Sequence, residues 1–225
     1  ATSAINNSTI KVGSSNVSTS EYSIGMAASS GSSINNIGDI YVTGSNSIGM
    51  YGDGIGSSVY NNGNIYLDAT GATSLNLKNQ MIGIYLDNGA HGENWGDVKT
   101  LSNYAGNTNV NTLVGISVQR GSTFENHGNI VINSDNGVGV YVNNGIIKNY
   151  GTITVIGDES TGVKYKNGEV APGVPLTPSN VGGTVTSVGG NSFEELLSNP
   201  TATVGNVVIA PDANGRLVAT LNGIE

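Results

Sequence analysis

The sequence predicts an all-β parallel β-helix, or β-solenoid, with rungs of about 24 residues. The first observation is a repeated unit, seen complete as STFENHGNIVINSDNGVGVYVNNG over residues 122–145. The second is a glycine that follows Ile, Val or Thr and recurs with spacings of 24, 34, 32, 24 and 23 residues, at positions 25, 49, 83, 115, 139 and 162. The third is that the apolar runs within the repeats are short and alternating, which indicates strands rather than helices.

Each repeat contains an apolar-x-Asn-x-Gly corner, a short alternating run, a polar turn and a second apolar run around the recurring glycine. Alternation places every second residue of a strand inside the coil. We therefore expect stacked inward columns made by Ile10/Val12, Ile40/Val42, Ile65/Leu67, Val98/Thr100, Ile130/Ile132 and Ile153/Val155.

The corner asparagines form a further column along the predicted coil. Stacked amides can satisfy the backbone groups of the turns and one another along the axis, so we interpret this column as structural. Its members are Asn6, Asn36, Asn61, Asn94, Asn126 and Asn149.

The domain organisation is a solenoid followed by a cap. We expect the solenoid over residues 1–190, with inserted loops at 13–23, 68–81, 101–113 and 166–181. The cap would occupy residues 191–225. In it, the Ser-x-x-Glu pattern beginning at Ser192 predicts a short helix, and the apolar runs on either side of residues 211–215 predict a β-hairpin. Such a cap would cover the open edge strands of the last rung.

Composition excludes several classes of function. The net charge is −8 and the chain has two arginines, which disfavours nucleic acid as a partner. It has no cysteine, so disulfides and thiolate metal sites are excluded. No apolar run reaches membrane-spanning length, so membrane attachment would need an anchor outside this sequence. We expect no cofactor and no metal.

We also expect no catalysis. Polysaccharide-degrading solenoids need clustered carboxylates or a basic residue beside metal-binding acids. Asp39 and Asp97 share the position after the corner glycine, but they do not lie on adjacent rungs. His91 and His127 fall in different rungs and share no motif.

Two features of the sequence are candidates for ligand binding. One is a tyrosine stripe formed by Tyr51, Tyr85 and Tyr141, interrupted by Ser117; recognition and simple packing between strands both account for outward tyrosines. The other is the pair of large insertions at residues 68–81 and 101–113, which leave the repeat at the same corner and so project from one edge. Ordinary loop variation explains insertions too. Their candidate residues are Leu75, Leu77, Lys78, Asn79, Tyr104, Asn107 and Asn109.

The units NNIGDIYVTGSNSIGMY and ENHGNIVINSDNGVGVY resemble those of bacterial type V autotransporter adhesins, particularly the large fusobacterial ones, and the resemblance covers about residues 3–168. It implies a passenger on the extracellular face of the bacterial outer membrane. Members of the family bind host glycans or host receptors of the carcinoembryonic-antigen adhesion family, and some are homotrimers. Together with the crossover rule for parallel strands, the resemblance predicts a right-handed coil.

We therefore expect a non-catalytic cell-surface adhesin domain that binds a host-cell protein or glycan. Two alternatives remain open. A passive structural spacer would show no specific binding, and a polysaccharide-degrading enzyme would need an acidic cluster assembled from distant positions.

Overall fold

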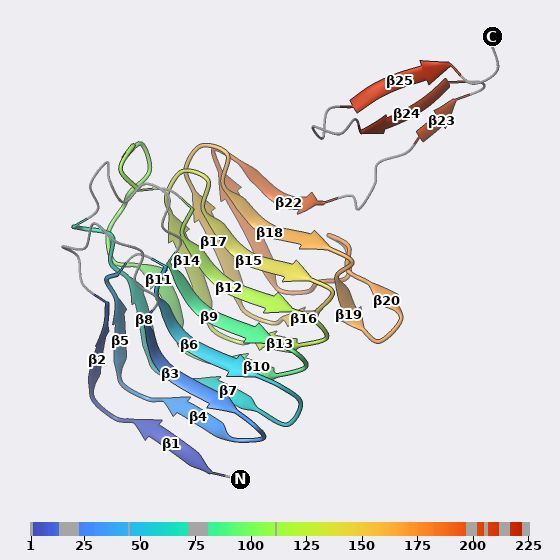
Figure 1. The fold of residues 1–225 in the computed structure, drawn as a ribbon. Helices are drawn as coiled ribbons and strands as arrows, with labels where there is room; N and C mark the ends of the chain where they lie inside the picture. Colours follow the sequence, from blue (N-terminus) through green and yellow to red (C-terminus); the bar gives the residue numbers. More distant parts are fainter. Residues whose placement is uncertain are drawn as a thin grey trace. The chain divides into compact units, whose positions relative to one another are not determined.

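The computed structural model describes residues 2–13, 23–44, 46–71, 81–110 and 112–196, together with three strands at 202–204, 207–211 and 217–221. Its main unit is a right-handed parallel β-helix with three faces, each formed by one sheet (Figure 1). The part of the chain that is described contains no helix. The predicted all-β solenoid with rungs of about 24 residues is thus confirmed.

Successive rungs contribute one strand to each sheet. The first sheet contains β1 (Ser3–Asn6), β4 (Ser33–Asn36), β7 (Ser58–Asn61), β10 (His91–Asn94), β13 (Thr123–Asn126), β16 (Ile146–Asn149), β19 (Glu169–Ala171) and β20 (Val174–Pro175). The second contains β2 (Thr9–Val12), β5 (Asp39–Val42), β8 (Asn64–Leu67), β11 (Asp97–Thr100), β14 (Asn129–Asn133), β17 (Thr152–Ile156) and β21 (Thr184–Val188). The third contains β3 (Ile24–Ser29), β6 (Ile48–Asp53), β9 (Ile82–Asp87), β12 (Val114–Gln119), β15 (Val138–Asn143), β18 (Thr161–Lys166) and β22 (Asn191–Glu195).

The core is built from the alternating residues of the strands. On the second sheet Ile40 pairs with Ile65, and both side chains are fully buried. The same inward columns continue through Val98, Ile130 and Ile153. Each such side chain contributes roughly 1.5–3 kcal/mol when it is removed from water, so the columns hold successive rungs together.

One predicted element is wrong: the residues after Ser192 form strand β22 instead of a helix. The local pattern favours a helix cap, but β18 presents an open edge, and β22 adds to the third sheet beside it. Phe193 packs against the core, and Glu194 accepts a hydrogen bond from Thr161 and pairs with Lys164 at 3.1 Å. These non-local contacts override the helical preference of the short segment.

The inserted loops differ in structure. Residues 14–22 and 72–80, which hold most of the first two, lie outside the described residues. The third folds back onto the coil, where Tyr104 forms an isolated bridge with Ser134. The fourth contains the antiparallel pair β19–β20, and its Pro175 lies on an edge strand, where a missing N–H costs no ladder bond.

The residues from Glu195 onward form a second, separate unit. Its described part is a three-stranded antiparallel sheet of β23 (Ala202–Val204), β24 (Val207–Pro211) and β25 (Leu217–Leu221). The predicted hairpin corresponds to β24 and β25, and β23 adds a strand that the sequence did not indicate. The capping role stays a prediction. Among the described residues, no helix has the length and apolar character needed to cross a membrane.

Candidate functional site

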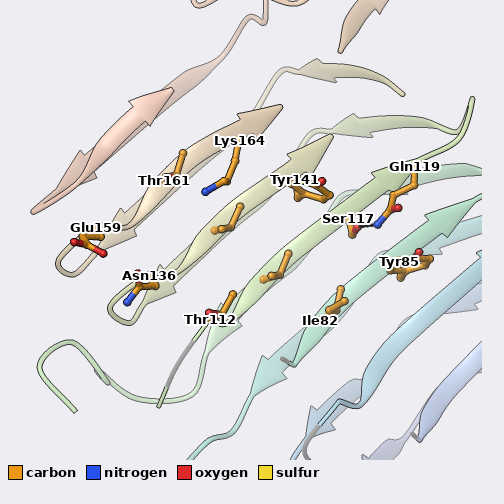
Figure 2. A pocket seen from close by; sticks show the side chains of 12 residues that line it. Ile82, Tyr85, Thr112, Ser117, Gln119, Asn136, Tyr141, Glu159, Thr161 and Lys164 are labelled. Carbon is orange, nitrogen blue, oxygen red and sulfur yellow. Dashed lines mark hydrogen bonds between the residues drawn. The ribbon is translucent and has the colours of Figure 1, made fainter. Parts of the chain in front are cut away.

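A groove runs across the outer face of the third sheet, over β9, β12, β15 and β18 (Figure 2). It encloses about 460 Å³, which lies within the range of about 300–1,000 Å³ typical of ligand pockets. Its floor is the column of residues that open these four strands: Ile82, Val114, Val138 and Thr161.

The recurring glycines allow neighbouring rungs of the third sheet to approach each other closely. A Cβ on Gly115 would lie 2.6 Å from the carbonyl oxygen of Gly139 and 2.8 Å from a methyl group of Ile130 inside the coil. The same close approach to the glycine of the next rung recurs at Gly49, Gly83 and Gly139. The glycine strip therefore lies inside the coil, where only a hydrogen side chain fits.

One wall of the groove is polar and consists of the turn residues Thr112, Asn136 and Glu159. All three have left-handed backbone conformations, with φ of 54°, 53° and 55°. Asparagine adopts this conformation readily, whereas a β-branched threonine does so at a steric cost. The three turns align their polar side chains along one side of the groove.

The opposite wall carries the tyrosine stripe. Tyr85, Ser117 and Tyr141 occupy the same register position on β9, β12 and β15, so they stand side by side. Ser117 is buried between the two tyrosines, and Gln119 donates a hydrogen bond to its hydroxyl at 3.0 Å (Figure 2). Lys164 follows Tyr141 in the column.

Two tyrosines of this stripe, Tyr51 and Tyr85, have a raised pKa. Burial raises the pKa of Tyr85, and the nearby carboxylate of Asp87 raises it further. Tyr51 packs against Tyr85 with ring centroids 5.6 Å apart and ring planes tilted by 37°, and burial likewise raises its pKa. Tyr51 and Tyr85 therefore offer neutral hydroxyl donors beside aromatic faces.

The structure thus brings together two of the predicted binding residues, Tyr85 and Tyr141, and places Tyr51 next to them along the stripe. It places Tyr104 in the core, with 5% of its surface exposed, where its hydroxyl accepts a hydrogen bond from the Ala69 amide at 3.1 Å. Tyr104 is therefore not a surface residue.

Two other predicted binding residues, Asn107 and Asn109, do not line the groove. They share a turn of the third insertion, where the Asn107 side chain accepts a hydrogen bond from the Asn109 amide. Leu75, Leu77, Lys78 and Asn79 lie outside the described residues. The sequence reasoning missed the groove floor and the left-handed wall. The sequence did carry a signal for the floor, namely the Ile, Val or Thr that precedes each recurring glycine.

The corner asparagines form a buried ladder inside the coil. From Asn6 to Asn126, each side-chain amide donates to the side-chain oxygen of the asparagine one rung further on, over 2.7–2.9 Å. The last amide, that of Asn149, donates to the backbone carbonyls of Gly151 and Gly182. Asn94 and Asn126 also donate to the carbonyl of the glycine two residues later in the same rung. The full ladder is Asn6, Asn36, Asn61, Asn94, Asn126 and Asn149, and every member is buried. It offers no surface to a ligand.

The two histidines lie on the first sheet and its corner, away from the groove. His127 is stacked between Trp95, with ring centroids 3.8 Å apart, and Tyr150, at 4.8 Å. His91 contacts Thr123 and Glu93. Within the described ranges, no three His, Asp or Glu side chains gather in a way that could hold a metal ion.

Comparison with protein families finds one relation. The family model for the third pectate lyase-like domain of BigA matches residues 1–97. Comparison with curated proteins and with solved structures finds no significant match. The family match supports an autotransporter-related passenger region of a bacterial protein, and it does not favour fusobacteria over other bacteria.

Proposed function

We propose that this chain is a ligand-binding, non-catalytic part of an adhesin on a bacterial surface, and that it attaches through the groove on the third sheet to a host-cell receptor or glycan. The observation that carries the proposal is the groove itself, whose floor of Ile82, Val114, Val138 and Thr161 lies between a tyrosine wall and a polar wall. Tyrosine combines a large contact area with few rotatable bonds, which suits it to recognition surfaces.

Two further observations support this proposal. BigA, whose third pectate lyase-like domain matches the first 97 residues, is an autotransporter-like surface adhesin. In addition, the charged side chains that line the groove are Glu159 and Lys164, from adjacent parts of one rung. A single acid beside a lysine that is already paired with Glu194 suits binding better than carboxylate-based hydrolysis.

The test is binding of the purified 225-residue chain to intact host epithelial cells and to immobilised host adhesion receptors and glycans, including receptors of the carcinoembryonic-antigen family. The variant Tyr85→Ala/Tyr141→Ala removes both aromatic faces of the groove. The matched control Tyr41→Ala/Tyr66→Ala removes a stacked pair on the second sheet, whose ring centroids are 4.8 Å apart. Circular dichroism checks that both variants are folded, and light scattering gives the oligomeric state.

We expect the groove variant to lose binding by about tenfold or more, since hot-spot tyrosines contribute about 2 kcal/mol or more each. The control should bind like the parent. Equal binding by parent and groove variant would move the site elsewhere, and no binding by the parent would favour a passive spacer.

The insertions need a separate test, because the third one is anchored in the core by Tyr104. Replacing residues 101–113 would therefore unfold part of the coil as well as remove surface. Replacing only residues 72–80 by a short turn removes Leu75, Leu77, Lys78 and Asn79 together. Retained binding in this variant would exclude these four residues from the site.

A further inference from the structure

Three aromatic rings stack in a column at the corner between the first and second sheets, and none of them lines the groove on the third sheet. His127 lies between Trp95 and Tyr150, with ring planes tilted by only 5° and 16°. Trp95 is 54% exposed. Its indole N–H donates to Glu93 at 2.7 Å, which fixes the orientation of the exposed ring. A fixed, exposed tryptophan is a preorganised contact surface.

The imidazole covers one face of Trp95, and the other face is open. Asn62 holds the equivalent corner position on the previous rung, because Asn64 and Asp97, two residues later, are register partners. The Asn62 side chain donates to Asn35 at 2.8 Å, one rung further back on β4, so it is directed away from the indole. A flat group can therefore lie on this face of Trp95.

The surface on both sides of this corner is acidic. Glu93 lies on β10 of the first sheet, and Asp39 and Asp97 lie on β5 and β11 of the second. Lys99 pairs with Asp97 at 2.8 Å. Within the part of the chain that the structure describes, no lysine or arginine forms an ion pair with Glu93 or Asp39. Because the whole chain also carries a net charge of −8, the corner attracts cations.

The second sheet already holds one cation between an aromatic ring and a carboxylate. The Lys99 ammonium lies 5.5 Å from the centre of the Tyr66 ring and 2.8 Å from the Asp97 carboxylate. Tryptophan provides a stronger face than tyrosine for such a contact. At the corner, Trp95 and Glu93 present the same two groups to an incoming cation.

We infer that this corner binds an arginine side chain of a basic polypeptide, with the guanidinium stacked on the open face of Trp95 and paired with Glu93. A planar guanidinium continues a stack of parallel rings and donates a fork of N–H groups to a carboxylate, which an ammonium cannot do. Ile37 holds the corner position one rung before Asn62 and is 52% exposed, so the aliphatic stem of the arginine packs against it. The surface is distinct from the groove, and the inference does not rest on the proposed function.

The chain contains a single tryptophan, so binding can be read directly at the site. The main probe is a peptide with arginines separated by glycines. The comparison probes are the same peptide with lysine or glutamine in place of arginine, and the polyamine spermidine. Each is titrated into the intact 225-residue chain and followed by calorimetry and by tryptophan fluorescence.

We expect the arginine peptide to bind about fivefold or more tightly than the lysine peptide and spermidine. The glutamine peptide should not bind measurably. The bound arginine peptide should also protect Trp95 from quenching by acrylamide, because the guanidinium covers the indole face.

Two variants test the two groups separately, with circular dichroism to check folding. Trp95→Ala removes the aromatic face, and Glu93→Gln removes the charge while its amide oxygen can still accept the indole N–H. We expect calorimetry to show binding weaker by about fivefold or more in each. The matched controls are Tyr150→Ala, at the other end of the stack, and Asp158→Asn, which removes one exposed charge between β17 and β18. Both should bind within about twofold of the parent.

Arginine-peptide binding that survives in folded Trp95→Ala or Glu93→Gln would overturn the inference, and so would binding that leaves Trp95 open to acrylamide. Equal affinity for the lysine peptide or spermidine would show a cation surface without a guanidinium site, which also contradicts it. The absence of any binding would reject it outright. All of these outcomes leave the proposed function standing, because none of the changed residues lines the groove.

Discussion

At the scale of single residues, the buried asparagines show how a coil without helices satisfies its corner backbone. The Asn94 amide, for example, donates to the carbonyl of Gly96 in its own rung and to the side-chain oxygen of the next asparagine, Asn126. A buried amide without partners is costly, so the ladder must be continuous to be stabilising. This is the reason that an asparagine recurs in every corner.

Replacing Asn94 with alanine tests this continuity. The change removes the acceptor of Asn61 and the donor to Asn126, so buried polar groups on both neighbouring rungs lose a partner. We expect the free energy of unfolding to fall by about 2–4 kcal/mol, measured by urea denaturation. The exposed Asn62→Ala is the control and should cost less than about 0.5 kcal/mol. Equal effects in the two variants would contradict a structural ladder.

A second residue-scale prediction concerns Thr112 in the polar wall of the groove. Its φ of 54° is unfavourable for a β-branched side chain, whereas Asn136 holds the equivalent position on the next rung at 53°. We expect Thr112→Asn to raise the free energy of unfolding by about 1 kcal/mol, seen as a higher Tm. A lower Tm would mean that contacts of the threonine outweigh its backbone strain.

At the scale of elements, the strands of the third sheet depend on close approach between rungs. The glycine in each strand contacts the backbone of the next one, and this brings the three sheets around a narrow core. At the end of the described coil, Ser192 occupies the corresponding place, since its carbonyl oxygen lies 2.6 Å from where a Cβ of Gly162 would be. Strand β22 therefore makes the same close backbone contact with β18 that the glycine strands make with one another.

Gly115→Ala should disrupt this approach. Its new methyl group would meet the carbonyl oxygen of Gly139 at 2.6 Å, and that backbone cannot move without displacing a whole rung. We expect a loss of about 1–3 kcal/mol in the free energy of unfolding, measured by thermal and urea denaturation. Ser117→Ala, two residues along the same strand and facing the groove, is the control and should change stability much less. Unchanged stability in Gly115→Ala would show that the coil can open at this point.

At the scale of the whole molecule, stability should be greatest over a broad neutral range of pH. A hydrogen bond from Trp95 holds the pKa of Glu93 below its ordinary value of 4.5, and one from Lys99 holds the pKa of Asp97 below 3.8. Burial raises the pKa of Tyr85 and Tyr104 above 10.0. The carboxylates stabilise the fold above their unfolded pKa values, and the tyrosines stabilise it below theirs.

The expected profile follows from these signs. The free energy of unfolding should fall as the pH drops below about 4.5 and again as it rises above about 10. Urea denaturation across this range measures it, and Glu93→Gln should flatten the acid limb by removing one depressed carboxylate. An acid limb identical in parent and variant would contradict the assignment of Glu93.

The sequence by itself determined the solenoid, its inward columns and the places where rungs are enlarged. This was possible because alternation and the recurring glycine are properties of single strands, and stacking repeats them without further information. The same reasoning placed Asn94 and its equivalents in one column. It succeeded wherever local pattern and rung period agree.

The tertiary structure decided which outward residues meet and how short segments pair. Ser117 and Tyr85 are 32 residues apart in sequence, and only the register of β9 with β12 places them side by side next to a groove. Tyr104 became a core residue because its loop folds back onto the coil, and the segment after Ser192 became a strand because β18 offers an open edge. In each case hydrogen bonds and burial supplied by distant residues outweighed the local preference.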